Sequence, residues 1–288
     1  RCAEATTPAP VRVAVVQGEA TTTAADRGED TVDRYVRLSE GQSADLIVWP
    51  ETAIAGPLNR FPFRQRQVGE LALRKQAHML IGAQEREDGR TYNSAYFIRP
   101  DGAIAGAYRK MDLVMFGEYV PGRERFPFLK RYPIRPFDFT AGRMRALFAA
   151  PEYTLSPLIC FEGIFPEQTR QICRLGAQLV VIITSDAWAV GGHEAQIHSA
   201  VGPFRAVEAR KYLVRAASIG RSAIYDPYGN ALAEVPCYQN GVAAAVVRRV
   251  DALSVYHFWG DWPLLVLSLV ALVCALSQAR RGTFIIQT

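Results

Sequence analysis

Short apolar runs rich in Val and Ile alternate with amphipathic stretches along the first 250 of the 288 residues. The runs have the length of strands, and the stretches between them repeat apolar residues every three or four positions, as helices do. This alternation predicts a layered α/β domain. The expected strands are residues 11–18, 44–51, 78–85, 92–100, 103–110, 157–162, 178–185, 211–218, 222–230 and 242–249, and the expected helices are residues 27–39, 64–76, 166–175 and 194–209.

Residues 116–148 interrupt the alternation with a long segment that is rich in aromatic residues and proline. Loops of this length in a compact domain are usually functional. We therefore expect the segment to contribute to a functional site.

An uncharged stretch of 18 residues, 262–279, lies near the end of the chain. As a helix it extends about 27 Å, close to the thickness of the hydrocarbon core of a bilayer. Trp259 and Trp262 flank one end, and Arg280 and Arg281 follow the other, as in an aromatic belt and a positive cytoplasmic flank. A buried core helix is the alternative. We predict one transmembrane helix, with the residues before it outside the cytoplasm.

Composition and short motifs argue against several classes of protein. The 33 Lys and Arg residues exceed the 28 Asp and Glu residues by only five, which does not by itself indicate a nucleic-acid partner and suits an anionic membrane surface equally well. Five cysteines without a C-x-x-C pair indicate neither a disulfide scaffold nor a zinc ribbon. His193 and His198 would point about 140° apart on a helix, so we expect no zinc site there. Nucleotide-binding and serine-hydrolase motifs are also missing from the sequence.

Three expected strands each deliver a polar side chain of different chemistry at or near their ends: Glu51, Lys110 and Cys160. Polar groups at strand ends are where α/β proteins build their sites. Each residue alone has an ordinary explanation, as a surface charge or as a small core residue. Together they supply a thiol nucleophile, a carboxylate to take its proton and a cation to stabilise the oxyanion of a tetrahedral intermediate. We expect one catalytic site.

With these three residues located, the chain resembles the nitrilase, or carbon-nitrogen hydrolase, superfamily over about residues 11–250. More narrowly, several motifs in the same order are similar to those of apolipoprotein N-acyltransferases. They are VWPETA (48–53), YRKMDLVMFGEYVPGR (108–123), LICFEGIFPE (158–167), SDAW (185–188), GPFRAVEARKYLVRAASIGRSAIYDPYGN (202–230) and GDWPLLVL (260–267). The resemblance implies a four-layer α-β-β-α sandwich followed by the C-terminal transmembrane helix at residues 262–279.

The resemblance also implies roles for individual residues. Glu51 would be the general base, Lys110 the oxyanion-stabilising cation and Cys160 the nucleophile. Glu118 and Glu162 fall on positions that the family treats as essential supports, although ordinary ion pairing would also account for them. Aromatic side chains could line an acyl-chain channel, although core packing explains each of them equally well. These aromatic candidates are Phe116, Tyr119 and Trp188, together with Phe61, Phe63, Phe126 and Phe128.

The implied activity is the transfer of an acyl chain from a phospholipid, through a Cys160 thioester, to the amino group of the diacylglyceryl-cysteine of an apolipoprotein. The implied partners are the phospholipid donor, the apolipoprotein acceptor and the membrane, without metal, organic cofactor or nucleic acid. The implied location is the outer side of the bacterial cytoplasmic membrane. The chain begins with Arg rather than Met and lacks the N-terminal membrane helices of the family, so we expect a fragment or a shortened relative.

Two other functions use the same residues. A membrane-tethered amidase or nitrilase would hydrolyse a small C–N substrate with the same triad, and a degenerate scaffold would bind lipoprotein without turnover. The terminal helix and the aromatic segment favour the transferase over the amidase, and the intact triad argues against the scaffold.

Overall fold

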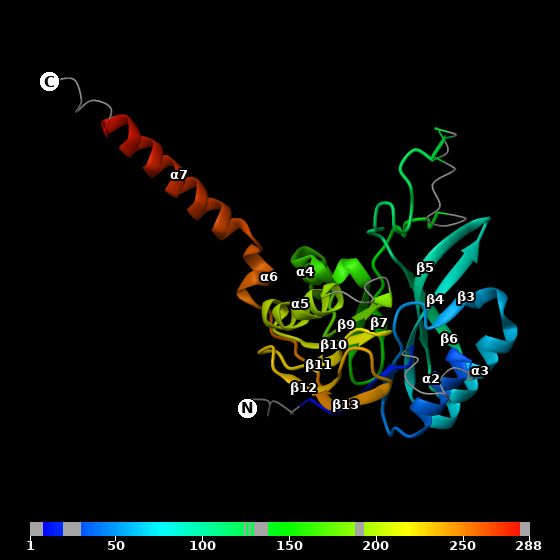
Figure 1. Cartoon of the computed structure of the whole chain (residues 1–288). Helices are drawn as coiled ribbons and strands as arrows, with labels where there is room; N and C mark the ends of the chain where they lie inside the picture. Colours follow the sequence, from blue (N-terminus) through cyan, green and yellow to red (C-terminus); the bar gives the residue numbers. More distant parts are fainter. Residues whose placement is uncertain are drawn as a thin grey trace, which may run out of the picture.

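The computed structural model describes residues 8–19, 30–123, 125–126, 128–129, 138–187 and 193–282, with side chains described up to residue 279. Two β-sheets lie face to face, and helices cover the outer face of each sheet (Figure 1). The result is the nitrilase-like α-β-β-α sandwich that the sequence predicts, with one long helix extending away from it.

The first sheet has the strand order β13-β1-β2-β4-β5-β6, and β3 pairs with β4 outside this path. Strands β1, β2 and β4 are mutually parallel, whereas β13, β5 and β6 pair in antiparallel fashion. Helices α2 and α3 cover its outer face. The bounds are β1 (Pro10–Gln17), α2 (Thr31–Glu40), β2 (Leu46–Val48), β3 (Ile54–Pro57), α3 (Pro62–Lys75), β4 (His78–Glu87), β5 (Arg90–Ile98), β6 (Ile104–Arg109) and β13 (Gly241–Arg248).

The second sheet has the strand order β12-β11-β10-β9-β8-β7. Its central strands β8, β9 and β10 are parallel, so their carboxyl ends lie at the same edge. Helices α4 and α5 cover its outer face. The bounds are β7 (Phe148–Ala149), β8 (Thr154–Ile159), α4 (Pro166–Arg174), β9 (Leu179–Thr184), α5 (Glu194–Ala209), β10 (Tyr212–Ala217), β11 (Ser222–Tyr225) and β12 (Ala231–Val235).

Three apolar layers hold the sandwich together. The central layer joins the two sheets, with Val13 and Val15 of β1 in the same cluster as Val181 and Ile183 of β9. A second layer packs the first sheet against α2 and α3, and a third packs the second sheet against α4 and α5. Every residue of β9 is buried because the strand is covered on both faces, which explains its uninterrupted apolar sequence.

Most expected elements are confirmed, and the differences have local causes. The expected strand at residues 157–162 ends at Ile159, and the chain continues as a 3-10 helix, η3 (Cys160–Ile164). The expected strand at residues 222–230 is two strands, because the Asp226 carboxylate accepts hydrogen bonds from the N–H groups of Tyr228 and Asn230 and closes a turn. The short strands β3 and β7 have no counterpart among the predictions.

The chain ends in a short helix, α6 (Val255–Trp259), and a long one, α7 (Trp262–Gly282). Helix α6 lies beside α4 and α5, and α7 projects from it into open space (Figure 1). Within α7 the stretch Trp262–Ala279 has a mean hydropathy of 2.0, and none of it is buried. Within the described residues α7 is therefore not a buried core helix, and it is long and apolar enough to cross a bilayer.

Candidate active site

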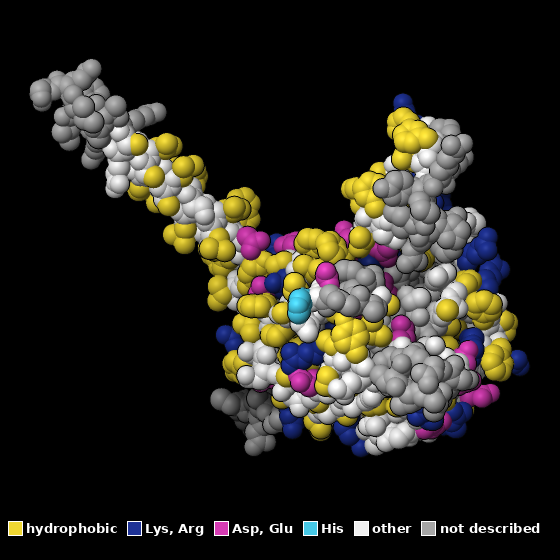
Figure 2. Space-filling model, viewed as in Figure 1, with side chains coloured by type: hydrophobic (Ala, Val, Ile, Leu, Met, Phe, Trp, Pro, Cys, Tyr) yellow, Lys and Arg dark blue, Asp and Glu magenta, His cyan; other side chains and the backbone are white. Residues whose placement is uncertain are grey.

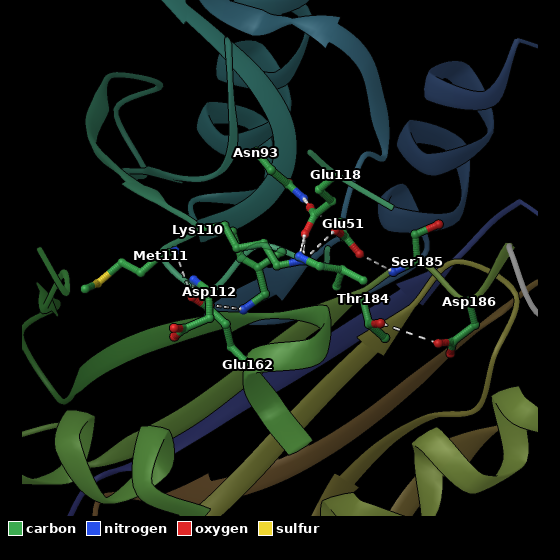
Figure 3. A network of polar contacts seen from close by, with 12 residues as sticks. Glu51, Asn93, Lys110, Met111, Asp112, Glu118, Glu162, Thr184, Ser185 and Asp186 are labelled. Atoms are coloured by element: carbon green, nitrogen blue, oxygen red, sulfur yellow. Dashed lines mark hydrogen bonds and ion pairs between the residues drawn. The ribbon is translucent and has the colours of Figure 1, made fainter. Parts of the chain in front are cut away.

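Polar side chains from the ends of strands in both sheets meet at one buried site (Figure 3). Glu51 follows β2, Lys110 follows β6, and Cys160 follows β8 of the second sheet. Their exposed fractions are 6%, 1% and 8%. The structure thus brings together the three residues that the sequence singles out, which lie up to 109 positions apart in the chain.

Lys110 is held between two carboxylates. Its Nζ lies 2.7 Å from Oε2 of Glu118 and 3.8 Å from Oε1 of Glu51. Burial opposes the charged form, but the negative charges of Glu51 and Glu118 outweigh it and raise the pKa of Lys110. Lys110 is therefore a fixed cation at neutral pH, as an oxyanion-stabilising group must be.

The Glu51 carboxylate has a hydrogen-bond donor on each oxygen. The Asn93 amide donates to Oε1 at 2.6 Å, and the backbone N–H of Ser185 donates to Oε2 at 2.7 Å. Burial raises the pKa of Glu51 and the charge of Glu118 adds to the rise, while Lys110 and the two donors oppose it. A buried carboxylate with a raised pKa is a better proton acceptor than an exposed one, which suits a general base.

Cys160 occupies a tight turn between β8 and η3. Its backbone φ is 53°, in the left-handed region that residues other than glycine seldom adopt. Burial raises the pKa of its thiol to about 12, with Glu51 adding to the rise and Lys110 and Thr184 opposing it. The thiol is therefore protonated at neutral pH and needs an adjacent base such as Glu51 to become a nucleophile.

Glu162, which is completely buried, links the turn at Cys160 to the segment after Lys110. One of its oxygens accepts a hydrogen bond from the N–H of Ile159 at 2.8 Å. The other accepts from the N–H of Met111 at 2.8 Å, from the Tyr108 hydroxyl at 2.7 Å and from Arg145 at 3.2 Å. Glu162 thereby fixes the spacing between the ends of β8 and β6.

Glu118 anchors the beginning of the aromatic segment as well as Lys110. Its Oε2 accepts a hydrogen bond from the N–H of Val114 at 2.8 Å, and its Oε1 accepts one from Asn93 at 2.9 Å. Asn93 therefore bridges Glu51 and Glu118. The contacts of Glu118 and Glu162 exceed simple ion pairing, since each carboxylate also binds backbone N–H groups.

Sequence reasoning missed Asn93, Glu19 and Asp186. Asn93 is buried on β5 beside Ser94, which is also buried, and two adjacent polar residues within a strand were the available signal. Glu19 follows β1 just as Glu51 follows β2. Burial raises the pKa of Glu19 to about 7, although hydrogen bonds with Ser218 and Tyr35 oppose the rise. Asp186 belongs to the SDAW motif, whose chemistry was left unassigned.

The aromatic candidates, unlike the charged ones, are exposed, partly buried or outside the described residues. Phe116 is 49% exposed and Phe128 is 68% exposed, Tyr119 is partly buried, and Trp188 lies outside the described residues. A small cavity in the described part of the molecule lies between α4, α5 and α6, beside Thr169 and Tyr256, rather than at Cys160. The acyl-chain channel therefore stays a prediction.

Neither candidate zinc ligand is directed at a metal site. The His193 ring is exposed and bonds Gln196, whereas the His198 ring is buried and bonds Asp186 at 2.7 Å. Across the described ranges, no cluster of three or more His, Cys, Asp or Glu residues could hold a metal ion.

A face-to-face α-β-β-α sandwich with a buried Glu, Lys and Cys where the strands end is the arrangement of the nitrilase fold. The family model for carbon-nitrogen hydrolases matches residues 12–255, and the chain belongs to this family. A solved amidase from Nesterenkonia sp. AN1 superposes with a TM-score of 0.65 at 18% identity, covering 90% of this chain and 99% of that one, which shows the shared fold.

Relatives of known name are more similar in sequence. An apolipoprotein N-acyltransferase of Geobacter metallireducens is 35% identical over 269 residues, which is 88% of this chain and 51% of that protein. One of Pseudomonas paraeruginosa is 33% identical over 254 residues, 86% of this chain and 50% of that protein. The chain thus spans about half the length of these relatives.

Proposed function

We propose that this chain catalyses N-acylation of lipoproteins at a membrane surface, with residues 11–250 as the catalytic domain and residues 262–279 as its membrane helix. The observation that carries the proposal is the convergence of Glu51, Lys110 and Cys160 in one buried site, on a chain that ends in an unburied apolar helix. The names of the relatives support the same activity.

The first half-reaction forms a thioester on Cys160. The Cys160 sulfur attacks the ester carbonyl of a phospholipid while Glu51 takes the thiol proton. Lys110 and the backbone N–H of Phe161 stabilise the oxyanion of the tetrahedral intermediate. The intermediate collapses, the glycerol oxygen leaves with the proton from Glu51, and a lysophospholipid departs.

The second half-reaction regenerates the thiol. The α-amino group of a diacylglyceryl-cysteine attacks the thioester carbonyl, and Glu51 takes a proton from the amine. Collapse of the second intermediate breaks the C–S bond, and the Cys160 sulfur recovers the proton from Glu51. The product carries an amide-linked acyl chain, and Lys110 keeps its charge while Glu51 holds the proton because Glu118, 2.7 Å away, still raises its pKa.

Exposed apolar side chains support a membrane-bound donor. Helix α7 exposes its apolar residues, and Trp259 at the end of α6 and Trp262 at the start of α7 are 61% and 67% exposed. Phe126 and Phe128, in the described part of the aromatic segment, also expose large rings. Figure 2 shows hydrophobic side chains along the projecting helix α7. Such surface is costly in water and is typical of proteins that contact lipid.

The test is the intact mass of the full chain in detergent micelles after phospholipid is added. We expect one added acyl chain, mapped to Cys160, and its loss when a diacylglyceryl-cysteine peptide follows. Cys160→Ala should remove the added mass. Cys173→Ala is the matched control, because Cys173 is also buried with a raised thiol pKa but lies on α4, and it should react like the unmodified protein.

The other outcomes separate the alternatives. Turnover of small amides without an acyl-enzyme from phospholipid would establish the amidase instead. An acyl chain that persists in Cys160→Ala, or that maps to Cys173 or Cys237, would show that the nucleophile is wrong. Binding of the lipopeptide with neither reaction would establish a non-catalytic scaffold.

A further inference from the structure

The Asp186 carboxylate of the SDAW motif is completely buried and has charged or polar partners on both oxygens. Nδ1 of His198 lies 2.7 Å from Oδ1, and the guanidinium of Arg215 lies 3.0 Å from Oδ2. The Thr184 hydroxyl also reaches Oδ1, at 3.4 Å (Figure 3). Burial opposes ionisation of Asp186, but the His198 hydrogen bond and the Arg215 charge outweigh it and lower its pKa.

The two residues directly before Asp186 contact the reacting groups. The N–H of Ser185 donates to Glu51 at 2.7 Å, so it fixes the orientation of the base. The Thr184 side chain interacts with the Cys160 thiol. Figure 3 shows Thr184, Ser185 and Asp186 in sequence at the end of β9, with Glu51 on one side.

The position of Asp186 is set by contacts from α5 and from β10 and the residue that follows it. His198 comes from α5 and Arg215 from β10, and the backbone of Thr184 is tied to the N–H of Ser218 at 3.1 Å. A side chain at Gly220 would meet Oδ2 of Asp186 at 1.8 Å, so the chain also closes over the carboxylate. These contacts hold the Asp186 carboxylate in one position.

We propose that Asp186 is a positioning residue for the Cys160 reaction. Its carboxylate, locked by His198 and Arg215, holds the end of β9 so that Ser185 orients the Glu51 base and Thr184 contacts the thiol. The inference deepens the proposed function and rests on its roles for Glu51 and Cys160. It concerns the cluster of Asp186, His198 and Arg215, which acts through Ser185 and Thr184.

Reactivity of the Cys160 thiol tests this inference without any acyl donor. Iodoacetamide alkylates the full chain in detergent micelles, and peptide mass spectrometry follows Cys160 across a pH series. The rate should rise with pH as Glu51 loses its proton, in an environment that also contains Lys110, Glu118 and, farther away, Glu19.

Asp186→Asn keeps the size of the side chain and removes its charge. We expect Cys160 alkylation to slow by at least about tenfold, the effect of losing one hydrogen bond to a charged group. We also expect the acid side of the rate–pH profile to move to higher pH, because a weaker Ser185 hydrogen bond leaves the pKa of Glu51 higher. Asp226→Asn is the matched control, since Asp226 caps the turn between β11 and β12.

A second variant covers the possibility that Asp186→Asn unfolds, which thermal unfolding would report. Thr184→Val leaves Asp186, His198 and Arg215 in place. It should slow alkylation without moving the acid side of the rate–pH profile. If a folded Asp186→Asn protein shows the alkylation rate and the rate–pH profile of the unmodified protein, the inference is overturned and the cluster has a purely structural role. If the unmodified protein transfers no acyl chain but these alkylation effects are observed, only the proposed function is overturned.

Discussion

The ammonium group of Lys110 lies 2.7 Å from Oε2 of Glu118, and each side chain is less than a tenth exposed. Glu51 is more distant, with Oε1 at 3.8 Å from the same nitrogen. Glu118 is therefore the principal partner of Lys110, and Glu51 keeps its oxygens for Asn93 and Ser185. This division leaves Glu51 available to accept a proton while Lys110 stays charged.

Glu118→Gln should lower turnover with little loss of folding. The amide cannot balance the charge of Lys110, so the ammonium should move toward Glu51, and a shift of about 1 Å in a catalytic group can cost about a hundredfold. The measurement is the rate of Cys160 acylation by phospholipid. Glu70→Gln, on the exposed face of α3, is the control. Equal rates for the two variants would show that Glu118 is not needed to place Lys110.

Glu51→Gln and Lys110→Ala should each reduce turnover by at least about a hundredfold while the domain stays folded. Their effects should not add, because both groups act on one transition state and removal of either disables it. The comparison needs the double variant together with each single one, followed by acylation rate and by thermal unfolding. A rate near that of the unmodified protein in either single variant, with an unchanged melting curve, would mean that the residue is a structural charge.

Glu19 should make the stability of the domain depend on pH. Burial raises its pKa in the folded state from 4.5 to about 7, so the folded protein holds this proton more tightly than the unfolded chain. The stabilisation of the folded state by this proton on Glu19 is fully present below pH 4.5 and is lost as the pH rises through about 7. Glu19→Gln should therefore gain stability relative to the unmodified protein between pH 5 and pH 8.

The measurement for Glu19 is the melting temperature of both proteins across that pH range. Glu40→Gln serves as a matched variant, because Glu40 forms an exposed ion pair with Arg74 at the end of α2. A constant difference between Glu19→Gln and the unmodified protein at all pH values would show that Glu19 titrates like an exposed carboxylate.

The sequence predicted the site through what strands do to their ends. Glu51, Lys110 and Cys160 each follow an apolar run, and a strand that enters a buried sheet delivers its next polar residue to an edge of that sheet. Apolar runs placed most strands, and apolar residues repeating every three or four positions placed the four helices. For Glu51, Lys110 and Cys160 the place in the local sequence pattern also determines the place in the fold, so the pattern was sufficient to predict that they meet.

The missed features depend on contacts between distant segments. Asn93 joins Glu51 to Glu118 across 42 and 25 positions, and nothing next to it in the chain indicates either partner. Asp186 meets Arg215 from a neighbouring strand, 29 positions away. The turn at Cys160 is likewise set by the contacts of Glu162 with Met111 and Arg145 rather than by its own sequence. Periodicity cannot reveal such partners, because they follow from the stacking of the two sheets.

The topology of the chain should follow the charges that flank α7. Arg280 and Arg281 come directly after the apolar span, whereas Asp261 and two tryptophans precede it. Positive residues next to a span favour the cytoplasmic side. We therefore expect the residues after α7 in the cytoplasm and the sandwich outside it, where exported lipoproteins are accessible.

The measurement of topology is a reporter that is active only outside the cytoplasm, fused after Tyr238 in one protein and after Thr288 in another, in cells that express the chain with any sequence that naturally precedes it. Activity after Tyr238 and silence after Thr288 is the expected pattern. Replacing Arg280 and Arg281 with Ala should weaken this bias, because the orienting charge is then lost, whereas the same change at Arg248 and Arg249, which lie farther from the span, should have less effect. The reverse pattern would place the site among cytoplasmic metabolites and favour the amidase, and release of the protein by salt without detergent would show that α7 does not cross the membrane.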